Sequence, residues 1–248
     1  MQTLLFLFGA ASIAGFIDTL AGGGGLLTLP ALILSGIPPH FALGTNKLQS
    51  SMGSGTATFM MFRTGRVSWQ TVKPLMQTAF FGSLLGTIAV QFINPGALNY
   101  IIPAVLIIIA LYFLLAPPLH ATGVCRVSDN GYRRFMVPMI GWYDGMFGPG
   151  TGSFFALAGV SLRGQGLIDA TATAKTLNFA TNAAALLIFL MAGKVVWLAG
   201  LTMMIGQFLG AFAGSLCLLR INAKYLRILV VTMCLGMLAR YAVSTGWL

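Results

Sequence analysis

The sequence predicts an all-α integral membrane protein built from two inverted repeats, and three observations carry this prediction. The 248-residue chain is 57% hydrophobic and only 7% charged, with a mean hydropathy of +0.89. Its apolar stretches recur at about the 20-residue length that crosses a hydrocarbon core. The second half repeats the first, and each half contains a glycine-rich break inside an apolar stretch. So little charge excludes an ordinary soluble domain of this size.

The formal net charge is +10, from 14 lysines and arginines against 4 acidic residues. In a soluble protein this excess would suggest nucleic-acid binding. Here the basic residues lie in short connections between apolar segments, as the positive-inside rule expects, so we predict a lipid bilayer and no nucleic acid as a partner. The three cysteines lack metal-binding spacing, and no metal, cofactor or disulfide framework is predicted. The first apolar stretch has no basic n-region and is expected to be retained.

The first break consists of four consecutive glycines, residues 22–25, within the apolar stretch 15–37. Each glycine costs a helix about 1 kcal/mol relative to alanine. Within a bilayer, irregular backbone persists only where protein or a water-filled cavity satisfies its polar groups. We therefore expect two short helices, 3–20 and 26–36, that meet at a polar site beside Asp18.

The second half matches the first in fixed register. Gly-Phe-Ile-Asp at 15–18 aligns with Gly-Trp-Tyr-Asp at 141–144, and the first break aligns with Gly-Pro-Gly-Thr-Gly at 148–152. Further along the chain, Lys47 aligns with Lys175. Chance matching of small apolar residues is the alternative, but coincident membrane lysines favour duplication.

The pattern divides the chain into a first repeat (1–118), a basic cytoplasmic linker (119–134) and a second repeat (135–248). In the second repeat, short helices are expected at 135–147 and 153–162. Each pair of short helices forms either a re-entrant hairpin or two thin spans. Either way a repeat crosses the membrane an odd number of times, which inverts its copy. The predicted long spans are 42–63, 70–93, 98–116, 168–192, 195–219 and 224–243.

The charges test this topology. With the 63–73 turn placed inside, ten basic loop residues lie inside and two outside, which agrees with the positive-inside rule. Both termini are then periplasmic. The ten are Arg63, Arg66, Lys73, Arg126, Arg133, Arg134, Arg163, Arg220, Lys224 and Arg227, and the two are Lys194 and Arg240.

Two lysines inside predicted spans, Lys47 and Lys175, are the strongest candidates for a site. A lysine at the centre of a membrane helix costs about 2.5–3.5 kcal/mol on insertion scales, so it needs a partner. The helices that follow the breaks direct positive dipole ends at the same region. We therefore predict an anion site with one lysine from each repeat. The alternative is that each lysine pairs with the aspartate of its own repeat.

The predicted substrate-binding residues comprise these lysines, polar neighbours on the same helices, and the breaks. Asp18 and Asp144 precede the breaks and are predicted to pin broken backbone or to carry a coupling proton. The full set is Lys47, Lys175, Asn46, Gln49, Thr173, Asn178, Gly23, Gly24, Gly25, Gly150 and Thr151.

The segments GFIDTLAGGGGLLTLPAL with ALGTNKLQ, and WYDGMFGPGTGSFF with AKTLNFATN, carry a family resemblance. Together they resemble the sulfite exporter TauE/SafE family, also called TSUP, and look closest to its YfcA-like branch. The resemblance implies a bacterial inner-membrane permease for small sulfur-containing anions such as sulfite or sulfoacetate. Pro149 and Thr151 stand where the first break has glycine, so the two half-sites are not equivalent.

The leading hypothesis is a secondary anion transporter that works by alternating access between inverted halves. No GxxxxGK[ST] loop is present, so ATP drive is not indicated. An anion channel or a non-transporting membrane protein is the alternative. A membrane-embedded aspartyl enzyme is disfavoured because the GxGD motif is absent. The exact anion, the direction of transport, a coupling proton or counter-ion and the oligomeric state stay open.

Overall fold

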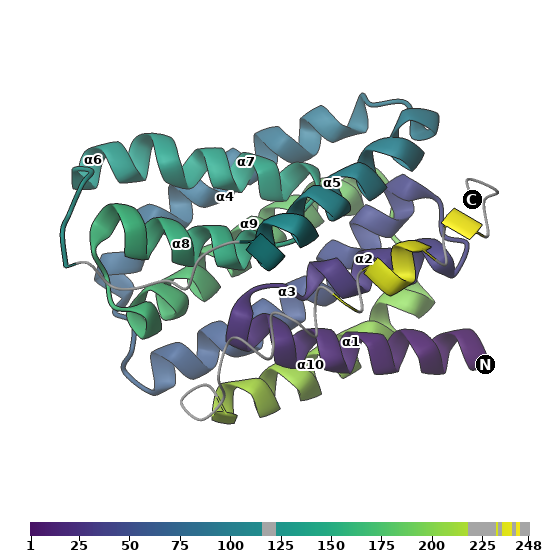
Figure 1. Ribbon diagram of the computed structural model, residues 1–248, viewed down its shortest axis with the longest axis horizontal. Helices are drawn as coiled ribbons and strands as arrows, with labels where there is room; N and C mark the ends of the chain where they lie inside the picture. The colour runs from purple at the N-terminus through teal and green to yellow at the C-terminus, as the bar shows by residue number, and fades with distance from the viewer. Residues whose placement is uncertain (116–122, 218–231, 233–234, 240–241, 244–248) are drawn as a thin grey trace.

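The computed structural model describes residues 1–115, 123–217, 232, 235–239 and 242–243, and every regular element there is helical (Figure 1). The predicted all-α fold is therefore confirmed, while most of the predicted span 224–243 lies outside the described residues. The helices are α1 (Gln2–Ala21), α2 (Gly25–Leu34), α3 (Pro39–Arg63), α4 (Trp69–Gln91), α5 (Pro95–Leu115), α6 (Asp129–Gly131), η1 (Tyr132–Met136), α7 (Val137–Met146), α8 (Thr151–Arg163), α9 (Leu167–Met191) and α10 (Trp197–Cys217).

The first glycine break reverses the chain. Gly22 caps α1 in the left-handed conformation, at φ 77°, which glycine adopts without strain. A Cβ atom on Gly24 would lie 2.9 Å from the main-chain oxygen of Ala14, so the chain after the break folds back onto α1. Helix α1 agrees with the expected helix 3–20 to within one residue at each end, and residues 2–20 are long and apolar enough to cross a membrane.

In the predicted second repeat, the segment expected to correspond to α1 is built from α6, η1 and α7, which follow one another without a gap. Helix therefore begins at residue 129 rather than 135, and it includes the end of the predicted linker. The polar composition of this segment concealed the helix. Two local interactions support its start: Ser128 Oγ accepts a hydrogen bond from the Gly131 N–H at 3.2 Å, and Asp129 forms an ion pair with Arg163.

Helices from one half of the chain pack mainly against helices from the other half. Helix α1 packs on α10, whereas α7 packs on α4, and the central pair α3 and α9 contact each other. In the α1–α10 pair and in the α4–α7 pair, the two helix backbones come into close contact at glycines. A Cβ atom on Gly82 of α4 would collide with the Pro138 main-chain oxygen of α7, and one on Gly210 of α10 would collide with the Ser12 oxygen of α1. Small residues of this kind allow helix backbones to touch in membranes.

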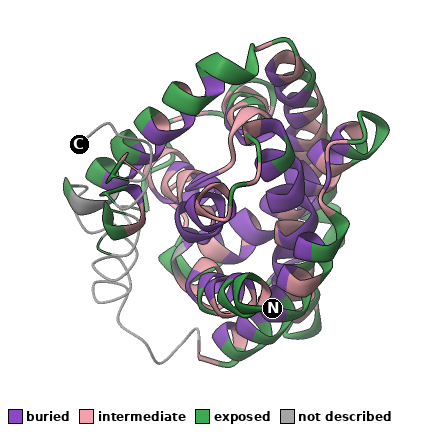
Figure 2. Cartoon of the chain, turned by 90° about the vertical axis from the view of Figure 1, so that its right-hand side faces the viewer, coloured by how far each residue is buried: buried purple, intermediate pink, exposed green. Residues whose placement is uncertain are grey.

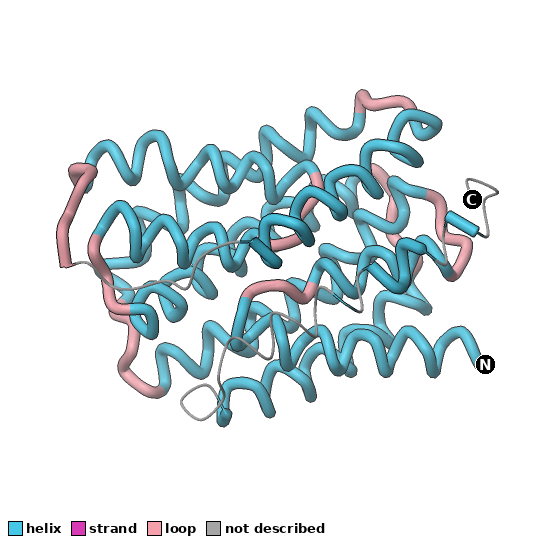
Figure 3. Tube along the Cα trace, viewed as in Figure 1, coloured by secondary structure: helices cyan, strands magenta, loops and turns pink. Residues whose placement is uncertain are grey.

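The turns gather at two opposite ends of the bundle (Figures 1 and 3). The turn between α3 and α4, residues 123–128, and the turn between α8 and α9 lie at one end. Arg63 and Arg163 close α3 and α8 there. The turns that join α2 to α3, α4 to α5 and α9 to α10 lie at the other end, where the Lys194 ammonium donates to Gln91 Oε1 at 2.9 Å.

Viewed end-on, the helices turn buried residues inward and exposed ones outward (Figure 2). Large apolar side chains such as Phe81 and Leu85 of α4 and Ile205 of α10 are exposed on the outer surface, as a lipid environment requires. Among the described residues, α1, α5, α9 and α10 are long and apolar enough to cross a membrane. Helix α3 has 25 residues but is less apolar, because its inner face carries the polar groups of the site.

Candidate functional site

The two glycine breaks lie against each other, midway along the bundle (Figure 3). A Cβ atom on Gly22 would collide with the backbone nitrogen of Ser153 at the start of α8. One on Gly25, at the start of α2, would lie 3.0 Å from Pro149 Cα in the second break. Backbone of one repeat therefore contacts backbone of the other at the point where both chains reverse.

A small polar cavity opens between the breaks. Its volume is about 20 Å³, which is room for about one water molecule. Main-chain atoms of both breaks, two carboxylates and several amide side chains surround it. The lining residues are Asp18, Gly22, Gly24, Gly25, Asn46, Ser50, Asp144, Gly148, Gly150, Gly152, Asn178, Asn182 and Gln207.

Each buried lysine forms an ion pair with an aspartate from the other half of the chain. Lys47 Nζ lies 3.1 Å from Asp144 Oδ2, and Lys175 Nζ lies 3.3 Å from Asp18 Oδ2. Each ammonium also donates a hydrogen bond to the main-chain oxygen of the same aspartate. The expected alternative of pairing within a repeat is therefore wrong. The two breaks face each other, so each lysine reaches the helix end of the other half.

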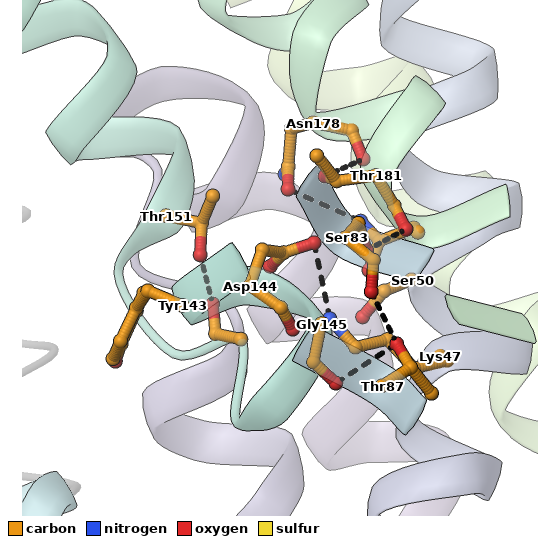
Figure 4. A network of polar contacts seen from close by, with 12 residues as sticks. Lys47, Ser50, Ser83, Thr87, Tyr143, Asp144, Gly145, Thr151, Asn178 and Thr181 are labelled. Atoms are coloured by element: carbon orange, nitrogen blue, oxygen red, sulfur yellow. Dashed lines mark hydrogen bonds and ion pairs between the residues drawn. The ribbon is translucent and has the colours of Figure 1, made fainter. Parts of the chain in front are cut away.

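The two ion pairs differ in how open they are. Both lysines and Asp144 are 1% exposed, whereas the Asp18 side chain is 18% exposed. Asp18 Oδ1 also accepts a hydrogen bond from the Gly24 N–H at 3.1 Å. Among the described groups, Asp144 Oδ2 accepts no well-directed hydrogen bond, although the Lys47 ammonium stands at ion-pair distance (Figure 4). Asp144 is thus enclosed, while Asp18 borders the first break.

Helices α3 and α9 bring amide groups to the cavity. Asn46 Oδ1 accepts hydrogen bonds from Thr28 Oγ1 at 2.6 Å and from Gln49 Nε2 at 2.8 Å. On α9, the Asn182 amide donates to Asn178 Oδ1 at 3.1 Å. Since every one of these side chains is buried, the network fixes which amide atoms face the cavity.

Helix α4 is fixed beside the site by two hydroxyl groups. Ser83 Oγ donates to the Thr181 main-chain oxygen at 2.7 Å, and Thr87 Oγ1 donates to that of Gly145 at 3.0 Å (Figure 4). These hydrogen bonds tie α4 to α9 and α7. The second break is therefore held by elements of both repeats.

The structure brings most of the sequence-predicted residues to one place. Seven line the cavity: Asp18, Gly24, Gly25, Asn46, Asp144, Gly150 and Asn178. Lys47 and Lys175 are not lining residues, but each forms an ion pair with one of the two lining carboxylates. The other four are not part of the lining: Gln49, Gly23, Thr173 and Thr151. Of these, Thr151 Oγ1 donates to the Gly148 oxygen at 2.8 Å, and Thr173 is half-buried on α9.

Three lining side chains were not among the predicted site residues: Ser50, Asn182 and Gln207. Asn182 lies four residues after Asn178, on the same helix face, so helical spacing could have found it. Gln207 is an amide within the apolar helix α10, and its repeat counterpart is Ala79. The cavity is therefore asymmetric, with more amide groups from the second repeat.

Comparisons with known proteins agree on one family. The model of the family described as sulfite exporter TauE/SafE matches residues 7–241. A probable membrane transporter protein, ORF9, of Sinorhizobium sp is 45% identical over 238 residues, which cover 96% of this chain and 91% of that protein. The probable membrane transporter protein YfcA of Escherichia coli K12 is 44% identical over 232 residues, covering 91% and 84%. No solved structure matches the chain significantly.

Proposed function

This chain belongs to the sulfite exporter TauE/SafE family of membrane transporters, and we propose that it is a secondary carrier for a small anion. The proposed substrate class is a sulfur-containing oxyanion or an organosulfonate, such as sulfite or sulfoacetate. The sulfur in this proposal rests on the family, whereas the anion rests on the residues of the site. We place the protein in a bacterial inner membrane with both termini periplasmic.

One observation carries the proposal: a small polar cavity lies where the two glycine breaks meet, inside an apolar bundle. Amide groups and the backbone at the start of α2 and α8 supply hydrogen-bond donors for the oxygens of an anion. The ammonium groups of Lys47 and Lys175 form ion pairs with the carboxylates that line the cavity. Ionisable groups buried at membrane depth are costly, and they mark substrate pathways.

The size of the cavity supports alternating access. Its volume of about 20 Å³ holds one heavy atom, whereas sulfite has four. The site must therefore widen to bind an anion of this size. Gly22 and Gly150 adopt positive φ angles of 77° and 81°, a conformation that glycine reaches without strain. Movement of one repeat against the other would open the cavity to each side in turn.

The distribution of basic turns supports the orientation. Arg63, Arg66, Arg126 and Arg163 belong to turns at one end of the bundle, and Lys194 lies at the other. By the positive-inside rule, the first end faces the cytoplasm.

Anion flux into proteoliposomes tests the function. We expect uptake of at least one member of a panel comprising sulfite, sulfoacetate, thiosulfate, methanesulfonate, sulfate and chloride. Lys47→Ala and Lys175→Ala should each reduce this uptake more than about tenfold, because each loses an ion-pair partner of a lining carboxylate. Lys73→Ala is the matched control, since Lys73 is exposed and lies outside the cavity.

Folding of each variant is checked by its elution from a sizing column in detergent. Unchanged flux in both lysine variants would contradict the two-lysine site and leave the breaks alone as the binding region. Saturable counterflow distinguishes a carrier from the alternative of an anion channel, in which a trans anion does not accelerate uptake.

A further inference from the structure

Resting on the anion-carrier function proposed above, we propose that the Asp18 carboxylate is a coupling-proton site. One proton binds Asp18 with each monovalent anion, and Lys175 then turns from the aspartate to the anion. The carrier is thereby an electroneutral proton–anion symporter.

The charges around the cavity motivate this proposal. The groups that face Asp18 are Lys175 from α9 and, across the cavity, Asp144 from α7 with its partner Lys47 from α3. No other titratable side chain lines the cavity in the described part of the chain. Two ammonium groups and two carboxylates sum to zero. A monovalent anion would add an uncompensated charge inside an enclosed site, which is costly, and one proton on a carboxylate removes that cost.

Geometry selects Asp18 rather than Asp144. The Asp144 side chain is 1% exposed and is paired with an equally buried lysine, so its carboxylate is less accessible to a proton than that of Asp18. The Asp18 side chain is 18% exposed and lines the cavity. Its Oδ1 accepts from the Gly24 N–H while Oδ2 faces Lys175, so a proton on Oδ2 leaves the hydrogen bond to the break intact.

Lys175 is already placed to receive the anion. A Cβ atom on Gly152, a lining residue at the start of α8, would lie 3.3 Å from Lys175 Nζ. The ammonium therefore borders the second break as well as Asp18. When a proton from water forms an O–H bond at Asp18 Oδ2, the ion pair is lost and the ammonium keeps all its protons. It retains the hydrogen bond to the Asp18 main-chain oxygen and presents its charge to the cavity.

The first measurement needs no variant. Wild-type protein in proteoliposomes is given methanesulfonate, whose single charge does not titrate, with the voltage clamped by potassium and valinomycin. An acid-outside gradient of one pH unit should accumulate methanesulfonate about tenfold, because one proton moves with each anion. Changing the clamped voltage should not alter this ratio, since no net charge crosses.

Variants then locate the proton. Asp18→Asn keeps an oxygen for the Gly24 N–H but cannot exchange a proton, so it should lose the accumulation of methanesulfonate that the pH gradient drives, and any counterflow that remains should not respond to pH. Asp169→Asn is the matched control, because Asp169 is an exposed acid in the first turn of α9, outside the cavity. It should accumulate the anion as wild type does.

Three outcomes overturn the proposal, and they can be told apart. Wild-type counterflow without a response to the pH gradient refutes the coupling but leaves the carrier function standing. Gradient-driven accumulation by Asp18→Asn at the wild-type level refutes the assignment to Asp18. Absence of wild-type counterflow with every anion of the panel, measured without any gradient, contradicts anion transport itself and removes the basis of both proposals.

Discussion

Replacing Lys47 with methionine is expected to abolish transport and to destabilise the protein by about 3–5 kcal/mol, because Asp144 is left as an uncompensated buried charge. Adding Asp144→Asn in the same chain is expected to recover most of the stability, though not transport. Both side chains of this pair are 1% exposed, so water cannot replace the lost partner. Thermal unfolding in detergent of the two single variants and the double variant measures the coupling.

The control for this experiment combines Lys47→Met with a substitution of the aspartate that Lys47 does not contact. Lys47→Met combined with Asp18→Asn should be no more stable than Lys47→Met alone, since Asp18 contacts Lys175 instead. In the mirror experiment, Lys175→Met should be rescued by Asp18→Asn. Rescue of Lys47→Met by Asp18→Asn, without rescue by Asp144→Asn, would show that the ion pairs form within repeats and would overturn the observed crossing.

Replacing Gly210 with leucine is expected to prevent α1 from docking on α10, with a loss of stability of at least about 1–3 kcal/mol. A Cβ atom there would meet the Ser12 main-chain oxygen, and backbone cannot give way as a flexible side chain can. Gly82→Leu should act in the same way on the packing of α4 against α7, where the Pro138 oxygen occupies the equivalent place.

Gly9→Leu serves as the control, since a Cβ atom on Gly9 of α1 would meet no atom within 4 Å. Expression, elution on a sizing column and the unfolding midpoint are compared for the three variants. If Gly210→Leu and Gly82→Leu unfolded at the wild-type temperature, the close backbone contacts that hold the two halves together would be refuted.

Much of the fold could be predicted because it follows from local features of the sequence, namely the lengths of the apolar stretches and the positions of glycine runs. The lengths of the apolar stretches predict α3 to α5, α9 and α10 to within a few residues at each end. Glycine runs predict where α1 and α2 separate, since glycine disfavours helix wherever it stands. The start of helix at residue 129 was missed, because that segment is polar and its helix depends on the Ser128 cap and the ion pair of Asp129 with Arg163.

Some residues of the candidate site could likewise be predicted from the sequence, and others could not. The sequence marked Lys47, Lys175, Asp18 and Asp144 because charges are rare within apolar stretches. It did not mark Gln207, a single amide on a helix whose neighbours are apolar, and tertiary packing alone brings that helix to the cavity.

By itself the sequence determined the family, the membrane environment, the two breaks and the four charged residues beside them, because composition and spacing are local properties of the chain. Which charge meets which was decided only by the tertiary structure. The ion pairs join residues 97 and 157 positions apart, Lys47 with Asp144 and Lys175 with Asp18. From the sequence alone, the two lysines and two aspartates could pair either within each half of the chain or between the halves. Contact between the two breaks places each lysine over the opposite helix end, and that geometry selects the crossed pairing.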